Sequence, residues 1–289
     1  MTMHRSDRSP CGASRRALLW ALTVVMGAVP APAAGIRHFA RSKGDHAPYR
    51  LTTPHFRVEF SVSAQIGQKY AALCERAYKN FRKKFHLADG VVVWQGRCRV
   101  LLFADRSEFS HFASNVHHSP GAAESGGYTR ITKKDPDIVL FLDGTNHTRL
   151  QQVLVHEMTH VFLQLYERDV PLPTWLHEGF AQYFEFRVQP GRSRLKSSKA
   201  RIKRLVRGGR QAPLAKFREA DFPATDLDSY AQAWSLVDFM VRKGSAKRTG
   251  DFVLALKHGA TQDEALRKTF RCSLDRFEQA WKSYVRQAY

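Results

Sequence analysis

Residues 147–166 restrict the possible folds of this chain most, because their pattern predicts a largely buried helix that also carries ionisable side chains. Apolar residues recur along the segment at helical spacing: Leu150, Val153, Leu154, Val161 and Leu165. Its middle reads His156-Glu157-Met158-Thr159-His160, so the two histidines share one helix face and Glu157 lies on an adjacent face. Burying these three groups without partners would cost on the order of several kcal/mol. A metal ion bound by both imidazoles would offset that cost.

The H-E-x-x-H pattern is rare enough to be informative. In a chain with 13 His and 11 Glu among 289 residues, chance alone produces it about 0.02 times. Two other interpretations exist, namely a pair of histidines on an exposed face and a buried cluster that satisfies its own hydrogen bonds. The apolar context favours the metal-binding interpretation over both.

A second helix is predicted from Pro173-Thr174 to about Phe186, and it offers two candidates for a third metal ligand. A catalytic zinc ion usually takes three protein ligands and keeps one position for water. Glu178 follows His160 after seventeen intervening residues, and His177 directly precedes Glu178. Neighbouring helical residues point about 100° apart, so only one of the two can face the ion. The spacing alone leaves both open.

The run Trp-Leu-His-Glu-Gly-Phe-Ala-Gln-Tyr-Phe-Glu, residues 175–185, together with the first motif resembles the gluzincin branch of zinc metallopeptidases. More specifically, it is similar to a bacterial family of exported, peptidase-MA-like proteins. The resemblance is sharp over about residues 150–186 and loose elsewhere. It implies that His156, His160 and Glu178 bind one Zn²⁺ per chain, with Glu157 as the general base.

Two further side chains are candidates for supporting roles. Related gluzincins place a Tyr or His downstream of the third ligand to stabilise the oxyanion, and Tyr230 is the candidate that this resemblance implies. The alternative is that Tyr230 and Trp234, one turn apart, simply pack on each other. Glu185 lies two turns beyond Glu178 and is either an acceptor that orients a ligand imidazole or a solvated or capping carboxylate. Gly179 is expected to allow close approach of the two motif-bearing helices.

The remaining pattern predicts an α+β fold, with a small antiparallel or mixed sheet packed on the active-site helix and a mainly helical C-terminal part. Residues 138–142 are the expected edge strand for an extended peptide. One domain is expected over 51–289, strand-rich over 51–168 and helical over 169–289. Strands are predicted at 56–62, 99–103, 127–132 and 137–142, and further helices at 64–85, 229–241, 250–257, 263–270 and 274–286.

The N-terminus reads as an export signal. Thirteen mostly apolar residues, 17–29, follow an arginine-containing segment and precede a small-residue site, which predicts a signal peptide over 1–33 and a linker over 34–50. A buried core helix is the alternative. The pair Arg15-Arg16 suits either the Sec or the twin-arginine route. The mature chain is expected to be periplasmic or extracellular and to lack a transmembrane segment, because no apolar run reaches about 18 residues.

The chain carries a formal net charge of +20, and twelve of its 46 Lys and Arg residues lie in the acid-free stretch 187–218. This stretch predicts a solvated flap beside the cleft, with helical pattern only over 200–206. It also suits an anionic envelope polymer or lipid surface, whereas a nucleic-acid partner is disfavoured because aromatic residues are almost absent from it. The three cysteines beyond the leader, Cys74, Cys98 and Cys272, allow at most one disulfide.

These features together predict a zinc-dependent metallopeptidase that acts on a peptide or protein substrate. A non-catalytic, zinc-containing envelope domain with a binding or structural role is one alternative. A basic polyanion-binding protein with an incidental motif is the other.

Overall fold

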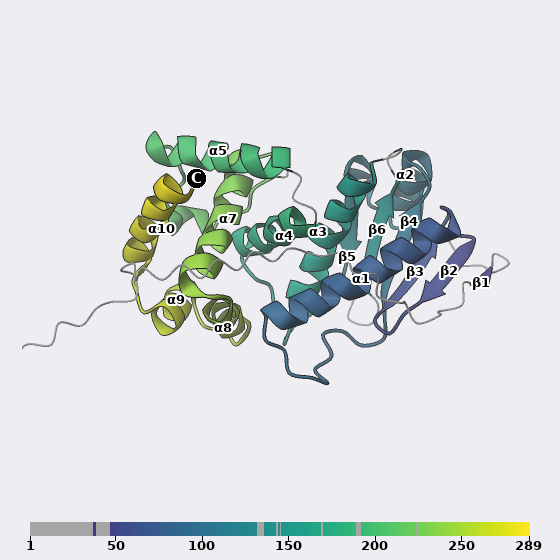
Figure 1. The fold of residues 1–289 in the computed structure, drawn as a ribbon, viewed down its shortest axis with the longest axis horizontal. Helices are drawn as coiled ribbons and strands as arrows, with labels where there is room; N and C mark the ends of the chain where they lie inside the picture. The colour runs from purple at the N-terminus through teal and green to yellow at the C-terminus, as the bar shows by residue number, and fades with distance from the viewer. Residues whose placement is uncertain are drawn as a thin grey trace, which may run out of the picture.

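The computed structural model describes residues 37–38, 47–131, 136–142, 144, 146–168, 170–188, 192–223 and 225–289. A sheet with its covering helices forms one part of the molecule, and a group of helices forms the other (Figure 1). Helices α3 and α4 lie between the two parts (Figure 1). The predicted signal peptide lies outside the described residues.

The sheet is mixed and has the strand order β1-β2-β3-β4-β6-β5. Strands β3, β4 and β6 are parallel to one another, and the other neighbouring pairs are antiparallel. The predicted edge strand at 138–142 is wrong, because β6 lies between β4 and β5 and the edge beside it belongs to β5. The bounds are Arg37–His38 for β1, Tyr49–Thr52 for β2, Phe56–Phe60 for β3, Cys98–Phe103 for β4, Gly127–Arg130 for β5 and Asp137–Phe141 for β6.

Helices cover both faces of the central strands. Successive residues of β4 are all apolar and buried from Val100 to Phe103, as expected for a strand with two covered faces. Helices α1 (Ala64–Lys84) and α3 (His147–Leu165) pack on one face, and the shorter α2 (Arg106–Asn115) packs on the other. Asn146 caps α3 by accepting a hydrogen bond from the Arg149 amide.

Two elements on the sheet side differ from the sequence expectation. Helix α2 was not predicted. It lies in the connection between the parallel strands β4 and β6, so the chain runs through strand, helix and parallel strand there, as it also does from β3 through α1 to β4. The apolar face of α2 consists of Phe109, Phe112 and Ala113 alone, which is too short a run to stand out. The predicted linker 34–50 contains β1 and the start of β2.

The C-terminal part is helical, as predicted. Its elements are α4 (Thr174–Val188), α5 (Arg192–Arg207), α6 (Leu214–Phe217), α7 (Leu227–Phe239), a π-helical turn (Met240–Gly244), α8 (Ala246–Lys257), α9 (Gln262–Phe270) and α10 (Leu274–Ala288). The predicted flap is wrong over α5, which is a continuous helix packed against α7 and α10. Its buried stripe of Ile202, Leu205 and Val206 lies within 200–206, the part for which a helical pattern was predicted, and the helix extends beyond it on both sides.

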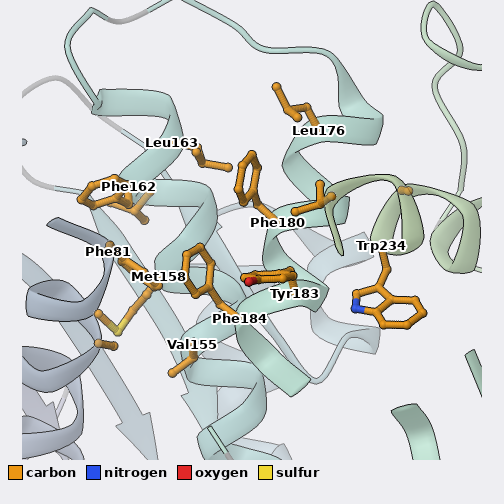
Figure 2. Packing of buried hydrophobic residues seen from close by; sticks show 14 of the residues in the cluster. Phe81, Val155, Met158, Phe162, Leu163, Leu176, Phe180, Tyr183, Phe184 and Trp234 are labelled. Carbon is orange, nitrogen blue, oxygen red and sulfur yellow. The ribbon is translucent and has the colours of Figure 1, made fainter. Parts of the chain in front are cut away.

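An apolar core fixes α4 relative to α3. Phe81 of α1 packs on Phe162 of α3 and Phe184 of α4, with ring centroids 5.2 and 4.7 Å apart. Figure 2 shows these rings beside Met158 and Phe180, with Trp234 of α7 on the other side of α4. Helix α4 is therefore held between α3 and α7, which sets the position of every side chain that it directs toward the motif.

The cysteines form no disulfide among the described residues. Cys74, Cys98 and Cys272 are free and buried, and burial raises the pKa of the Cys98 thiol well above its usual value. Over the described ranges, no helix is both long and apolar enough to cross a membrane.

Candidate metal centre

Three side chains from α3 and α4 converge. His156 and His160 lie one turn apart on α3, with ring centroids 4.9 Å apart. Glu178 of α4 faces both, with its Oε2 3.5 Å from His156 Nε2 and its Oε1 3.6 Å from His160 Nε2. One donor atom from each residue lies within 4.8 Å of the other two.

This donor set fits a metal ion. Two imidazole nitrogens and a carboxylate oxygen are ligands that zinc accepts, and tetrahedral bonds of about 2.0–2.1 Å would place ligand atoms roughly 3.4 Å apart. Each imidazole has a Glu178 oxygen close to that spacing, Oε2 at 3.5 Å for His156 and Oε1 at 3.6 Å for His160. The Glu178 Oε2 atom is buried without a hydrogen-bond partner among the described residues, which is the condition that an ion would relieve.

The protonation states also suit metal binding. Burial, with the neighbouring His156, lowers the pKa of His160 to about 3, so its imidazole is neutral at physiological pH. Burial alone would raise the pKa of Glu178, but His156 and His160 outweigh it and bring the value to about 2. A neutral imidazole and an ionised carboxylate are the forms that bind metal.

Glu157 lies beside this triad and has a different environment. Burial raises the pKa of its carboxyl to about 7, with His156 opposing and Glu178 adding to the rise. A carboxyl that titrates near neutral pH can both accept and return a proton. The arrangement therefore places a proton acceptor next to the candidate metal ligands.

His177, the rival third ligand, lies near the centre but outside the triad. Its ring centroid is 5.7 Å from that of His160, and its pKa is lowered to about 4 by burial and by Lys257. Among the described residues, His156, His160 and Glu178 are the group whose donor atoms could hold an ion together. The geometry thus favours Glu178, which the spacing could not do.

Glu185 supports the centre from behind. Its Oε2 lies 3.1 Å from His156 Nδ1, and its side chain is only 2% exposed. Arg149 Nη1 donates to its other oxygen at 2.7 Å, and Arg194 Nη1 binds the same oxygen. A buried, paired carboxylate excludes the solvated alternative. Neither arginine was singled out in the sequence, because no motif or periodicity distinguishes them from other cations.

Tyr230 reaches the centre from the first turn of α7. Its hydroxyl lies close enough to the Glu178 carboxylate to affect its pKa: burial, together with Glu178, raises the pKa of Tyr230. Its ring packs edge-on against Phe222 at 5.4 Å. Trp234 packs instead on Phe186 and Tyr289, so the alternative of a Tyr230–Trp234 pair is wrong.

A family model described as the peptidase MA superfamily matches residues 133–287, more than half of the chain. The chain belongs to this superfamily. Its members are peptidases, typically zinc enzymes, and the residues that could hold an ion lie within the matched span. A search of curated proteins found no match.

The part of this peptidase MA domain around Gly179 differs from expectation. A Cβ atom at Gly179 would lie 2.6 Å from the Ala233 carbonyl oxygen and 2.8 Å from Val237 Cγ2. The close approach is therefore between α4 and α7, whereas it was predicted between the two motif-bearing helices. Its consequence is that Glu178 and Tyr230 are brought together by one tight helix contact.

Proposed function

We propose that this chain is a zinc-dependent metallopeptidase of the gluzincin type that hydrolyses peptide bonds. The observation that carries the proposal is the convergence of three donor atoms from two helices beside a carboxyl with a pKa of about 7. His156, His160 and Glu178 would hold the ion. When bound, zinc lowers the pKa of its water ligand toward 7 and polarises the scissile carbonyl.

Side chains of this chain would then transfer the proton and stabilise the developing negative charge. Glu157 accepts a proton from the attacking water and passes it to the leaving amine. Tyr230, whose hydroxyl already lies at the centre, donates a hydrogen bond to the oxyanion as it forms. Glu185 binds the Nδ1 atom of His156, which leaves the Nε2 atom of the same imidazole to bind the ion.

A turnover experiment tests this function. Metal-stripped and zinc-loaded protein, wild type and Glu157→Gln, are incubated with a peptide library, and products are identified by mass spectrometry. We expect cleavage only by the zinc-loaded wild type, with a loss of about three orders of magnitude or more in the variant. Zinc binding without cleavage in either protein would favour a non-catalytic envelope domain, and cleavage that ignores zinc would overturn the proposal.

We also propose that the protein is exported. The leader pattern over residues 1–33 supports this location, by either the Sec or the twin-arginine route. N-terminal sequencing of the protein recovered from a bacterial periplasm or medium would test it. We expect the mature chain to begin at Ala34, and an uncleaved, cytoplasmic product would contradict the proposal.

A further inference from the structure

Two arginines bind one carboxylate next to the metal centre. Arg149 comes from the first turn of α3 and Arg194 from the first turn of α5, and both donate to Glu185 Oε1. The Glu185 side chain is buried, whereas those of Arg149 and Arg194 are 42% and 43% exposed. Both guanidinium groups therefore lie between the buried His156–Glu185 pair and the solvent.

The charges of this group do not balance. One carboxylate neutralises one guanidinium, so Arg149, Arg194 and Glu185 together carry a net charge of +1. Burial lowers the pKa of Arg194 to about 10, and the nearby positive charge of Arg149 adds to the effect. A second anion at this position would relieve the repulsion between the two cations.

The chemistry of the pair favours a carboxylate. A guanidinium carries five N–H donors in a fixed planar arrangement, and Glu185 accepts from a single nitrogen of each arginine. Each side chain therefore has further donors, in a geometry that suits the two oxygens of a carboxylate.

One arginine of the pair also lies along α3 from the proposed proton acceptor. Arg149 precedes Glu157 by about two turns on α3, and its charge acts to lower the pKa of that carboxyl. Arg194, from the basic stretch 187–218, contacts Glu185. A peptide that is bound at the triad and extends toward the start of α3 would meet Arg149, and with it Arg194, which shares Glu185.

We propose that Arg149 and Arg194 form a carboxylate-recognition subsite, which selects peptides that carry a carboxylate close to the scissile bond. The carboxylate belongs either to an acidic side chain or to the free C-terminus of the peptide. This inference rests on the proposed peptidase function and names its substrate class. It assigns to one residue of the basic stretch a role that net charge alone does not indicate.

Binding, measured apart from turnover, tests the subsite. Zinc-loaded Glu157→Gln protein is titrated by calorimetry with two pairs of otherwise identical peptides, one pair differing as Asp and Asn and the other as free and amidated C-terminus. We expect the carboxylate member of one pair to bind about ten- to a hundredfold more tightly. The pair that shows the preference identifies the source of the carboxylate.

Variants of α5 separate this subsite from general positive charge. Arg194→Gln, added to the Glu157→Gln protein, should abolish the preference and keep one zinc per chain. The control Arg204→Gln removes an exposed cation ten residues along the same helix, about 15 Å away, and should keep the preference. Three outcomes would overturn the inference: no preference in either pair, equal losses in both variants, or loss of zinc together with the preference, which would make Arg194 a positioning residue.

The proposed peptidase function is judged separately, from turnover by the wild-type protein. A carboxylate preference in binding without any turnover would support the subsite and contradict peptidase activity. Turnover without a carboxylate preference in binding would support peptidase activity and contradict the subsite.

Discussion

Three glutamates lie at the candidate metal centre, and their surroundings give them different chemical properties. Glu178 faces two imidazoles and has a pKa of about 2, so it is an anion at any physiological pH. Glu157 is also buried, but His156 and Arg149 lower the pKa of its carboxyl by less than burial and Glu178 raise it, so the pKa is about 7. Glu185 is buried between two arginines and the Nδ1 of His156. A glutamate can therefore serve as a metal ligand, a proton acceptor or a positioning group, depending on the groups that surround it.

Replacing Glu185 tests its positioning role. Glu185→Gln removes the charge that faces His156 Nδ1, and we expect zinc affinity to fall about ten- to a hundredfold. Competition with a chromophoric chelator measures the affinity. Glu167→Gln is the control, because its partner His258 lies outside the centre, and it should bind zinc as the wild type does. Equal affinity in Glu185→Gln and wild type would contradict the role.

Replacing Tyr230 tests the oxyanion donor. Tyr230→Phe removes only the hydroxyl, so we expect kcat to fall about a hundred- to a thousandfold, with KM and zinc content close to wild type. Tyr128→Phe, which removes a hydroxyl that faces His117 on the sheet, should leave kcat unchanged. A Tyr230→Phe enzyme within twofold of the wild-type kcat would show that the hydroxyl serves Glu178 alone.

How far the sequence predicts this centre differs from residue to residue. His156, Glu157 and His160 follow from one local motif, because helical geometry fixes their relative positions. The choice between Glu178 and His177 requires the packing of α4, which the sequence does not encode locally. Arg149 and Arg194 carry no local signal at all, since their role depends on three helices meeting at Glu185.

At the scale of elements, the site depends on α4 being held between α3 and α7. Phe162 and Phe184 fix one contact through Phe81, and Gly179 allows the other. The sequence predicts all three helices, with α4 marked by its start at Pro173-Thr174 and not by an apolar period. The sequence did not predict α2 or most of α5, because their short or narrow apolar stripes are surrounded by polar or basic residues.

Gly179→Ala tests the contact between α4 and α7. The added Cβ would meet the backbone oxygen of Ala233 at 2.6 Å, and backbone cannot rotate away. We expect a loss of about 1–3 kcal/mol in the free energy of unfolding and a lower kcat, because Tyr230 moves with α7. Urea unfolding and turnover measure the two effects.

Gly121→Ala is the matched control for this substitution. A Cβ at Gly121, in the 3-10 helix Pro120–Glu124, would meet nothing within 4 Å. We expect its free energy of unfolding to stay within about 0.5 kcal/mol of wild type. Similar losses in both variants would contradict a specific role for the α4–α7 contact.

At the scale of the whole molecule, buried charges join distant segments. Lys257 of α8 donates to the backbone carbonyls of Gln164, Arg168 and Val170, which ties the helical part to the loop between α3 and α4. Asp238 of α7 accepts hydrogen bonds from Tyr284 and Tyr289, at 2.7 and 2.8 Å. Such long-range partners could not be predicted from the sequence, although the α+β class and the helical C-terminal part could.

Asp238 makes stability depend on pH. Burial would raise its pKa, but Arg242 and Tyr284 outweigh that effect and hold the pKa below its usual value. Its stabilising contribution is therefore complete above the pKa of the unfolded chain, about 3.9, and is lost as the pH falls through the lower folded value. We expect Asp238→Asn to lose about 3 kcal/mol at pH 7.

Urea unfolding of wild type and Asp238→Asn over a series of pH values measures this dependence. The difference between the two proteins should shrink as the pH falls below about 4. A difference that stays constant down to pH 2 would show that Asp238 acts through its shape and not through its charge.

Calorimetric titration of the metal-stripped chain with zinc tests the central claim, that His156, His160 and Glu178 form one metal site. We predict one zinc per wild-type chain, and affinities weaker by about a hundredfold or more in His160→Gln and Glu178→Gln. His177→Gln, the rival ligand next to Glu178, should bind zinc as the wild type does. A wild-type chain that binds no zinc, or a His177→Gln chain that loses zinc while Glu178→Gln retains it, would contradict the account.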